Sequence, residues 1–94
     1  MRPTHRHPTH PGQVLLHEFL EPAGISRSAL ARHIGVSPRH VGGIVRGKRG
    51  VTAETAWMLA QAFETSPELW VNLQTSYDLA RSRPARKTKP LRAS

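Results

Sequence analysis

Six Lys and Arg side chains lie between residues 27 and 49, and no Asp or Glu lies among them. They are Arg27, Arg32, Arg39, Arg46, Lys48 and Arg49. Lys and Arg side chains bind phosphate groups. An Arg guanidinium can also form hydrogen bonds to both acceptors on the edge of a guanine, and this paired contact contributes about 1 to 3 kcal/mol of discrimination between bases. Residues 11–80 as a whole carry six basic and six acidic side chains, so their charges cancel. The basic side chains are nevertheless separated along the sequence from the acidic ones. This separation predicts a localised surface for a polyanion.

The formal net charge of +8 comes from the two ends of the sequence. Residues 1–10 and 81–94 together carry eight Lys and Arg side chains and no acid. The stretches 1–9 and 84–94 contain too few apolar residues to offset the entropy cost of ordering. We therefore expect a flexible N-terminal arm and a disordered basic tail around one folded domain, residues 10–83.

Length and composition limit the class of protein. The sequence has 94 residues, which suffice for one domain with one small core, and no Cys for a disulfide or a thiolate metal site. It contains no apolar run of about 18 residues and no hydrophobic signal core. We expect a cytoplasmic protein.

Apolar residues recur at helical spacing in five segments, whereas no strand-like alternation of useful length appears, so the predicted fold is all-α. Hydroxyl side chains suited to capping precede four of these segments, namely Ser26, Ser37, Thr52 and Ser66. We expect helices to begin near Pro11, Arg27, Pro38, Thr52 and Pro67, and the last to run to about Arg83.

The second and third predicted helices match a helix-turn-helix template. Gly35 lies where the chain must reverse, and the small Ala31 lies where two short, steeply crossed helices would touch. The third helix would enter the major groove of DNA with its N-terminal residues facing the bases, so Arg39 and His40 are the candidates for base recognition. The full set of predicted DNA contacts is Arg27, Ser28, Ser37, Arg39, His40, Gly43, Arg46, Lys48 and Arg49.

Gly42 and Gly43 stand in the middle of the proposed recognition helix, where each costs roughly 0.8 to 1 kcal/mol relative to Ala. Two explanations remain open: the backbone approaches DNA or a partner closely there, or the helix reads few bases and depends on DNA shape and phosphates. We favour the second.

Beyond these residues, the sequence resembles the HigA-type antitoxins of bacterial toxin-antitoxin modules, within the Cro and lambda-repressor-like helix-turn-helix class. The resemblance covers residues 10–83 and rests on His10-Pro11-Gly12, Glu18-Phe19-Leu20-Glu21-Pro22, Ser28-Ala29-Leu30-Ala31, Ile44-Val45-Arg46-Gly47-Lys48-Arg49-Gly50, Thr65-Ser66-Pro67-Glu68-Leu69-Trp70, Asn72-Leu73-Gln74 and Tyr77-Asp78-Leu79. It implies a five-helix domain that binds operator DNA as a homodimer and represses its own operon. It also implies direct binding and neutralisation of a HigB-type toxin, a RelE-like mRNA endonuclease.

The last predicted helix carries more apolar surface than one small core needs, which predicts a dimer interface. Its stripe consists of Leu69, Trp70, Leu73, Tyr77 and Ala80, and the sequence alone does not divide these residues between core and interface. A RelE-like toxin is expected to be basic, so we predict toxin contact at Glu18 and Glu21 on the first helix, together with the N-terminal arm.

Other functions have weaker support. The His-rich arm (His5, His7 and His10, with His17 after it) lacks the acids or Cys of a preorganised metal site, so we expect no metal and no cofactor. No nucleophile elbow, phosphate loop or carboxylate pair indicates an enzyme. The alternatives are a stand-alone repressor without a toxin partner and a protein-interaction module that does not bind DNA.

Overall fold

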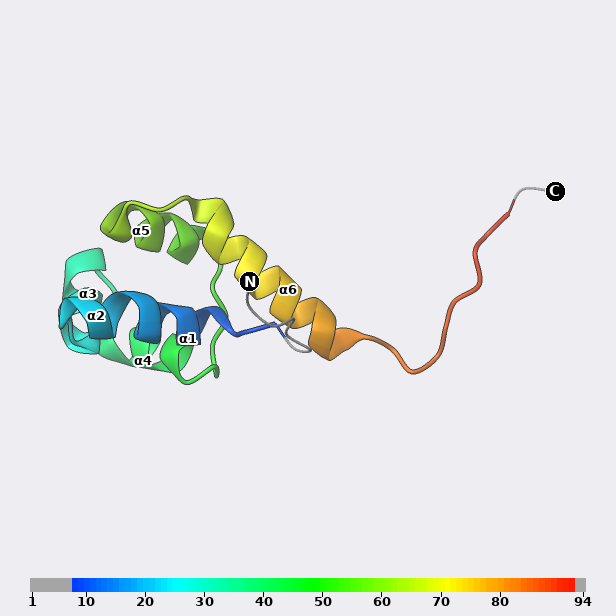
Figure 1. Cartoon of the computed structure of the whole chain (residues 1–94), viewed down its shortest axis with the longest axis horizontal. Helices are drawn as coiled ribbons and strands as arrows, with labels where there is room; N and C mark the ends of the chain where they lie inside the picture. Colours follow the sequence, from blue (N-terminus) through cyan, green and yellow to red (C-terminus); the bar gives the residue numbers. More distant parts are fainter. Residues whose placement is uncertain (1–7, 93–94) are drawn as a thin grey trace.

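In the computed structural model, which describes residues 8–92, the described chain forms helices and no strand (Figure 1). The elements are α1 (Pro11–Val14), η1 (Leu15–Leu20), α2 (Glu21–Ala23), α3 (Arg27–Ile34), α4 (Pro38–Val45), α5 (Ala53–Phe63) and α6 (Pro67–Ser82). The first three follow one another without a break and form a single helix. The prediction of an all-α fold with five helices is therefore confirmed.

Hydroxyl caps start four of the helices. The side-chain oxygens of Ser26, Ser37, Thr52 and Ser66 each accept a hydrogen bond from the backbone N–H three residues later, at 3.0 to 3.2 Å. Each such cap contributes about 1 kcal/mol. Gly35 ends α3 in the left-handed conformation, with φ of 81°, as the sequence predicts.

The first helix widens in its middle segment, η1, into π-helical turns. The Glu21 N–H bonds to the carbonyl of Leu16, five residues back. Pro22 follows, and its ring would press against the carbonyl of Glu18 in a regular α-helix. The wider turn relieves this clash, so the helix continues through Pro22 and ends at Gly24.

Trp70 is the largest side chain of the core and is fully buried, at 0% exposure. Its indole N–H donates to Thr65 Oγ1 at 2.8 Å, and Phe19 packs against its ring with 5.3 Å between centroids. The prediction that Trp70 lies in a dimer interface is therefore wrong. Its hydrogen-bonded indole joins α6 to the rest of the core within one chain.

The start of α1 packs against the end of α4. A Cβ added to Gly12 would lie 1.8 Å from the carbonyl oxygen of Ile44, so only a glycine permits this approach. Gln13 Nε2 donates to the carbonyl of Val45 at 3.2 Å and satisfies an acceptor at the end of α4. The first helix thereby fixes the position of α4.

Residues 83–92 leave the end of α6 and run away from the helical body without further helix or strand (Figure 1). Residues 1–7, which include most of the predicted arm, lie outside the described residues. Over residues 8–92, no helix is both long and apolar enough to cross a membrane.

Candidate nucleic-acid interface

The crossing of α3 and α4 has the features of a helix-turn-helix. Ala31 is fully buried, and its carbonyl accepts the N–H groups of both Gly35 and Val36 at 2.9 Å. Leu30 on α3 and Val41 on α4 are also buried in the same core. This packing leaves the starts of both helices at the surface.

The predicted contact residues at these helix starts are accessible. Arg27 and Ser28 at the start of α3 are exposed, as are Ser37 and Arg39 at the start of α4, while His40 is half-buried. The structure thus places these polar side chains on the two adjacent helix N-termini, where backbone N–H groups and the helix dipoles favour anions.

None of these cations is neutralised by a described acid. Within residues 8–92, the only ion pair joins His17 to Glu21 at 3.0 Å. Arg27, Arg39 and the cations of the turn after α4 therefore keep their charge available for an anionic ligand. A surface whose cations are unpaired attracts a polyanion more strongly than one whose cations form salt bridges.

The basic turn, residues 46–50, is held in place from two sides. The carbonyl of Gly43 accepts the N–H groups of Lys48 and Arg49 at 2.9 and 3.1 Å. On the other side, Gln74 Oε1 of α6 accepts the Val51 N–H at 2.8 Å, and Gln74 Nε2 donates to Asp78. The cations of this turn thus project from an ordered backbone beside α4. The sequence names Gln74 only within the family resemblance and gives it no role, because that role depends on a contact with a residue 23 positions away.

The predicted DNA contact at Gly43 is wrong. Gly43 is buried, and an added Cβ would lie 3.3 Å from Cβ of Arg49. Gly42 is buried too, and its added Cβ would meet the Arg46 guanidinium at 3.0 Å. The two glycines therefore make room for side chains of the basic turn, and they do not bring backbone to a surface where DNA could reach it.

His40 lies close to Arg49 on this surface. Burial lowers the pKa of its ring, the positive charge of Arg49 lowers it further, and Glu54 acts in the opposite direction. A neutral imidazole carries one donor and one acceptor, so it can bond to either kind of group on a base edge.

His10 links the start of α1 to α6 and the basic turn. Its Nδ1 accepts the Gly12 N–H at 2.9 Å and caps α1, and its ring stacks edge-on against Tyr77 with 4.7 Å between centroids. Its ring carbons also lie about 3.9 Å from where a Cβ on Gly47 would be. The sequence did not single out this cap, since His is not a usual capping residue.

The residues predicted to meet a toxin lie on one exposed side of the first helix. Glu18 and Glu21 are both exposed, and a carboxylate oxygen of Glu21 lies 3.0 Å from Nδ1 of His17. Glu18, but not Glu21, borders a groove of about 530 Å³ between the first helix and α6, which is lined by Pro8, Thr9, Gln13, Val14, His17, Glu18, Leu73 and Ser76.

The remaining residues of the predicted dimer stripe differ in their exposure to solvent. Leu69 and Ala80 are exposed, whereas Leu73 and Tyr77 are half-buried. Leu79, which is not one of the predicted stripe residues, is 68% exposed. The apolar surface that α6 leaves uncovered therefore centres on Leu69, Leu79 and Ala80.

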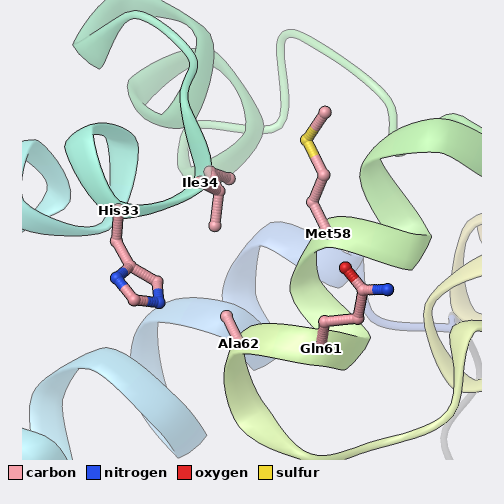
Figure 2. A pocket seen from close by; sticks show the side chains of 5 residues that line it. All are labelled: His33, Ile34, Met58, Gln61 and Ala62. Carbon is pink, nitrogen blue, oxygen red and sulfur yellow. The ribbon is translucent and has the colours of Figure 1, made fainter.

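A smaller hollow of about 240 Å³ lies between α3 and α5 (Figure 2). His33, Ile34, Met58, Gln61 and Ala62 line it. One His and no carboxylate do not form a catalytic or metal-binding group. Over the described residues, no three His, Cys, Asp or Glu side chains are placed to hold a metal ion; His5 and His7 lie outside that range.

Comparison with known proteins identifies the family to which this helix-turn-helix belongs. A helix-turn-helix family model, HTH_3, matches residues 16–70. Virulence-associated protein I of Dichelobacter nodosus is 47% identical over 70 residues, which are 74% of this chain and 65% of that protein's length. Antitoxin HigA-1 of Vibrio cholerae is 45% identical over 80 residues, 84% of this chain and 74% of that protein.

A solved structure of the Pseudomonas aeruginosa antitoxin HigA with the higBA promoter superposes with a TM-score of 0.79 and 46% identity, covering 81% of this chain and 83% of that chain. The chain therefore belongs to the HTH_3 helix-turn-helix family and, within it, to the HigA-type antitoxins.

Proposed function

We propose that this protein binds operator DNA as a homodimer, represses its own toxin-antitoxin operon and neutralises a HigB-type toxin by direct binding. The observation that carries the proposal is the surface of α3, α4 and the basic turn, whose cations have no described acidic partner. The similar HigA of Pseudomonas aeruginosa, solved with the higBA promoter, supports DNA of the same kind as the ligand.

On this proposal α4 lies in the major groove. Arg39 and His40, in its first turn, contact base edges, while Ser37 at its N-cap contacts a phosphate. Arg27 and Ser28 at the start of α3 contact the phosphates of one strand. Arg46, Lys48 and Arg49 contact phosphates beyond the end of α4. Arg32 is exposed on the last turn of α3 and has no assigned role, so it provides a control position.

The dimer would form through the uncovered apolar side chains of α6. Leu69, Leu73, Tyr77 and Ala80 remain proposed interface residues, and the exposed Leu79 joins them. A two-fold arrangement that sets two α4 helices about 34 Å apart would match half-sites one turn of DNA apart. Sedimentation equilibrium tests this step: a dimer is expected, and Leu79→Glu should shift it towards monomer.

The toxin would bind at the first helix. Glu18 and Glu21 offer negative charge to a basic partner, and the groove between this helix and α6, which Glu18 borders, offers a concave surface for it. Glu18→Lys with Glu21→Lys should weaken binding of the product of the neighbouring gene and leave DNA binding intact. The matched control is Glu64→Lys, an exposed acid at the end of α5.

The proposal as a whole is tested by footprinting the full chain on the DNA upstream of its own gene and by co-purifying it with the neighbouring gene product. Protection of one palindromic site together with a stable protein complex is expected. Protection without a complex would favour the stand-alone repressor, and a complex without protection would favour the protein-interaction module.

A further inference from the structure

Residues 74–77 of α6 lie beside the basic turn that follows α4. Gln74 accepts a hydrogen bond from Val51, at the end of that turn, and Tyr77 touches His10, whose ring lies against Gly47. These side-chain contacts place this part of α6 at the edge of the molecule that the basic turn forms, where Arg46, Lys48 and Arg49 are proposed to bind phosphates.

A second group of unpaired cations begins at this edge. The basic segment, residues 81–92, contains Arg81, Arg83, Arg86, Lys87, Lys89 and Arg92 and no acid. All of these side chains are exposed, and none pairs with a described Asp or Glu. The cations of the segment are thus as available as those of the helix-turn-helix.

Arg81 is held at the start of the segment. Its Nη1 donates to the hydroxyl of Tyr77 at 3.0 Å, and its guanidinium carbon lies 5.3 Å from the centre of the same ring. A guanidinium has five N–H donors, so this one bond leaves others for a phosphate. Tyr77 therefore fixes the first cation of the segment on the side of α6 where His10 and the basic turn lie.

We propose that residues 81–92 form a second DNA-binding segment, which contacts the phosphates that flank the base pairs read by α4. The proposal rests on the operator binding proposed above. The stretch from Pro84 to Arg92 extends at most about 30 Å, or roughly nine base-pair steps of 3.4 Å. The reach suits a flank adjoining one half-site and excludes a distant site.

The chemistry of the segment favours the DNA backbone over other ligands. Leu91 is its only large apolar side chain and is fully exposed, so the segment has little with which to anchor an apolar protein surface. Of these cations only Arg81 lies in the last turn of α6, where the helix dipole also stabilises a positive charge. The four cations from residue 86 onward are too far along the chain for that role.

The test compares the full chain with a variant carrying Arg86→Gln, Lys87→Gln, Lys89→Gln and Arg92→Gln. Affinity is measured by fluorescence anisotropy across salt concentrations on two duplexes, one trimmed to the footprinted site and one extended by about ten base pairs on each side. A variant with Arg86→Lys and Arg92→Lys keeps the charge and is the matched control. Thermal melting verifies that every variant folds like the unaltered chain.

On the extended duplex, removal of each phosphate contact should reduce the slope of log K against log salt by about 0.9, so the four substitutions should reduce it by up to roughly 3.6 per chain. On the trimmed duplex the difference should largely vanish, and the Lys control should match the unaltered chain on both. Equal slopes on the extended duplex would overturn the inference, as would an equal reduction on both duplexes. Failure of the unaltered chain to bind either duplex would instead refute operator binding itself.

Discussion

Replacing Gly12 by Ala tests how the first helix positions the DNA-binding helix. The added Cβ would lie 1.8 Å from the oxygen and 2.7 Å from the carbon of the Ile44 carbonyl, both backbone atoms that cannot turn aside. Because ordinary contacts need about 3.4 Å or more, α1 and the end of α4 must separate. That movement also strains the Gln13 hydrogen bond to Val45 and the His10 cap on Gly12.

The cost follows from these three effects. Overpacking costs about 1 to 3 kcal/mol, a weakened hydrogen bond about 0.5 to 1.5, and removal of a cap about 0.5 to 2. We therefore expect Gly12→Ala to lower the free energy of unfolding by about 2 to 6 kcal/mol, a large share of what a small domain possesses. For a chain of this size, a decrease at the lower end already reduces Tm by roughly 8 to 16 °C.

Gly42→Ala is the matched control for urea and thermal unfolding. Its added Cβ meets only the end of the Arg46 side chain, at 3.0 Å, which can swing away. Ala is better than Gly in a helix interior by roughly 0.8 to 1 kcal/mol, so this variant should be neutral or slightly stabilised. If Gly12→Ala unfolded within about 0.5 kcal/mol of the unaltered chain, the close approach of α1 to α4 would be refuted.

Three further predictions concern recognition and pH. Burial lowers the pKa of His10, Asp78 acts against this and Arg81 adds to it, so the unfolded chain binds a proton more readily. The contribution of His10 to the free energy of unfolding should be fully present above a pH of about 6.5 and should be lost as the pH falls below it. His10→Asn, which can still cap α1, should reduce this loss in thermal melts from about pH 5 to 8, leaving the part due to His40. Arg39→Gln should weaken operator binding by about 1 to 3 kcal/mol and relax specificity at one base pair, whereas Arg32→Gln should change it little; equal effects in a binding titration would rule out base reading by Arg39. Gln74→Ala leaves the Val51 N–H without its acceptor, so it should cost about 1 to 3 kcal/mol in urea unfolding and also weaken DNA binding through the basic turn.

Local signals were sufficient to predict the helices. Ser26, Ser37, Thr52 and Ser66 each form a hydrogen bond within their own helix, so their positions mark the helix starts without knowledge of the rest of the fold. The cationic surface was predictable for a similar reason, because α3, α4 and the turn after them are consecutive.

Features that depend on contacts between distant elements were not predictable. The periodicity of α6 shows that Trp70 lies on its apolar face but not whether a core or a second chain covers that face. The role of Gly43 depends on where Arg49 folds back, and the role of His10 depends on Tyr77, far along the chain. The π-helical turns before Pro22 also escape hydrophobic periodicity, which assumes a regular helix.

The central claim is that the unpaired cations at the starts of α3 and α4 and in the basic turn bind operator DNA. Titration of the full chain with the footprinted duplex and with a shuffled duplex, over a range of salt concentrations, tests it most directly. Six to eight phosphate contacts per dimer predict saturable binding with a log-log slope of about −5 to −7 and clear preference for the footprinted sequence. Binding that was insensitive to salt, or equally strong on both duplexes, would contradict the claim.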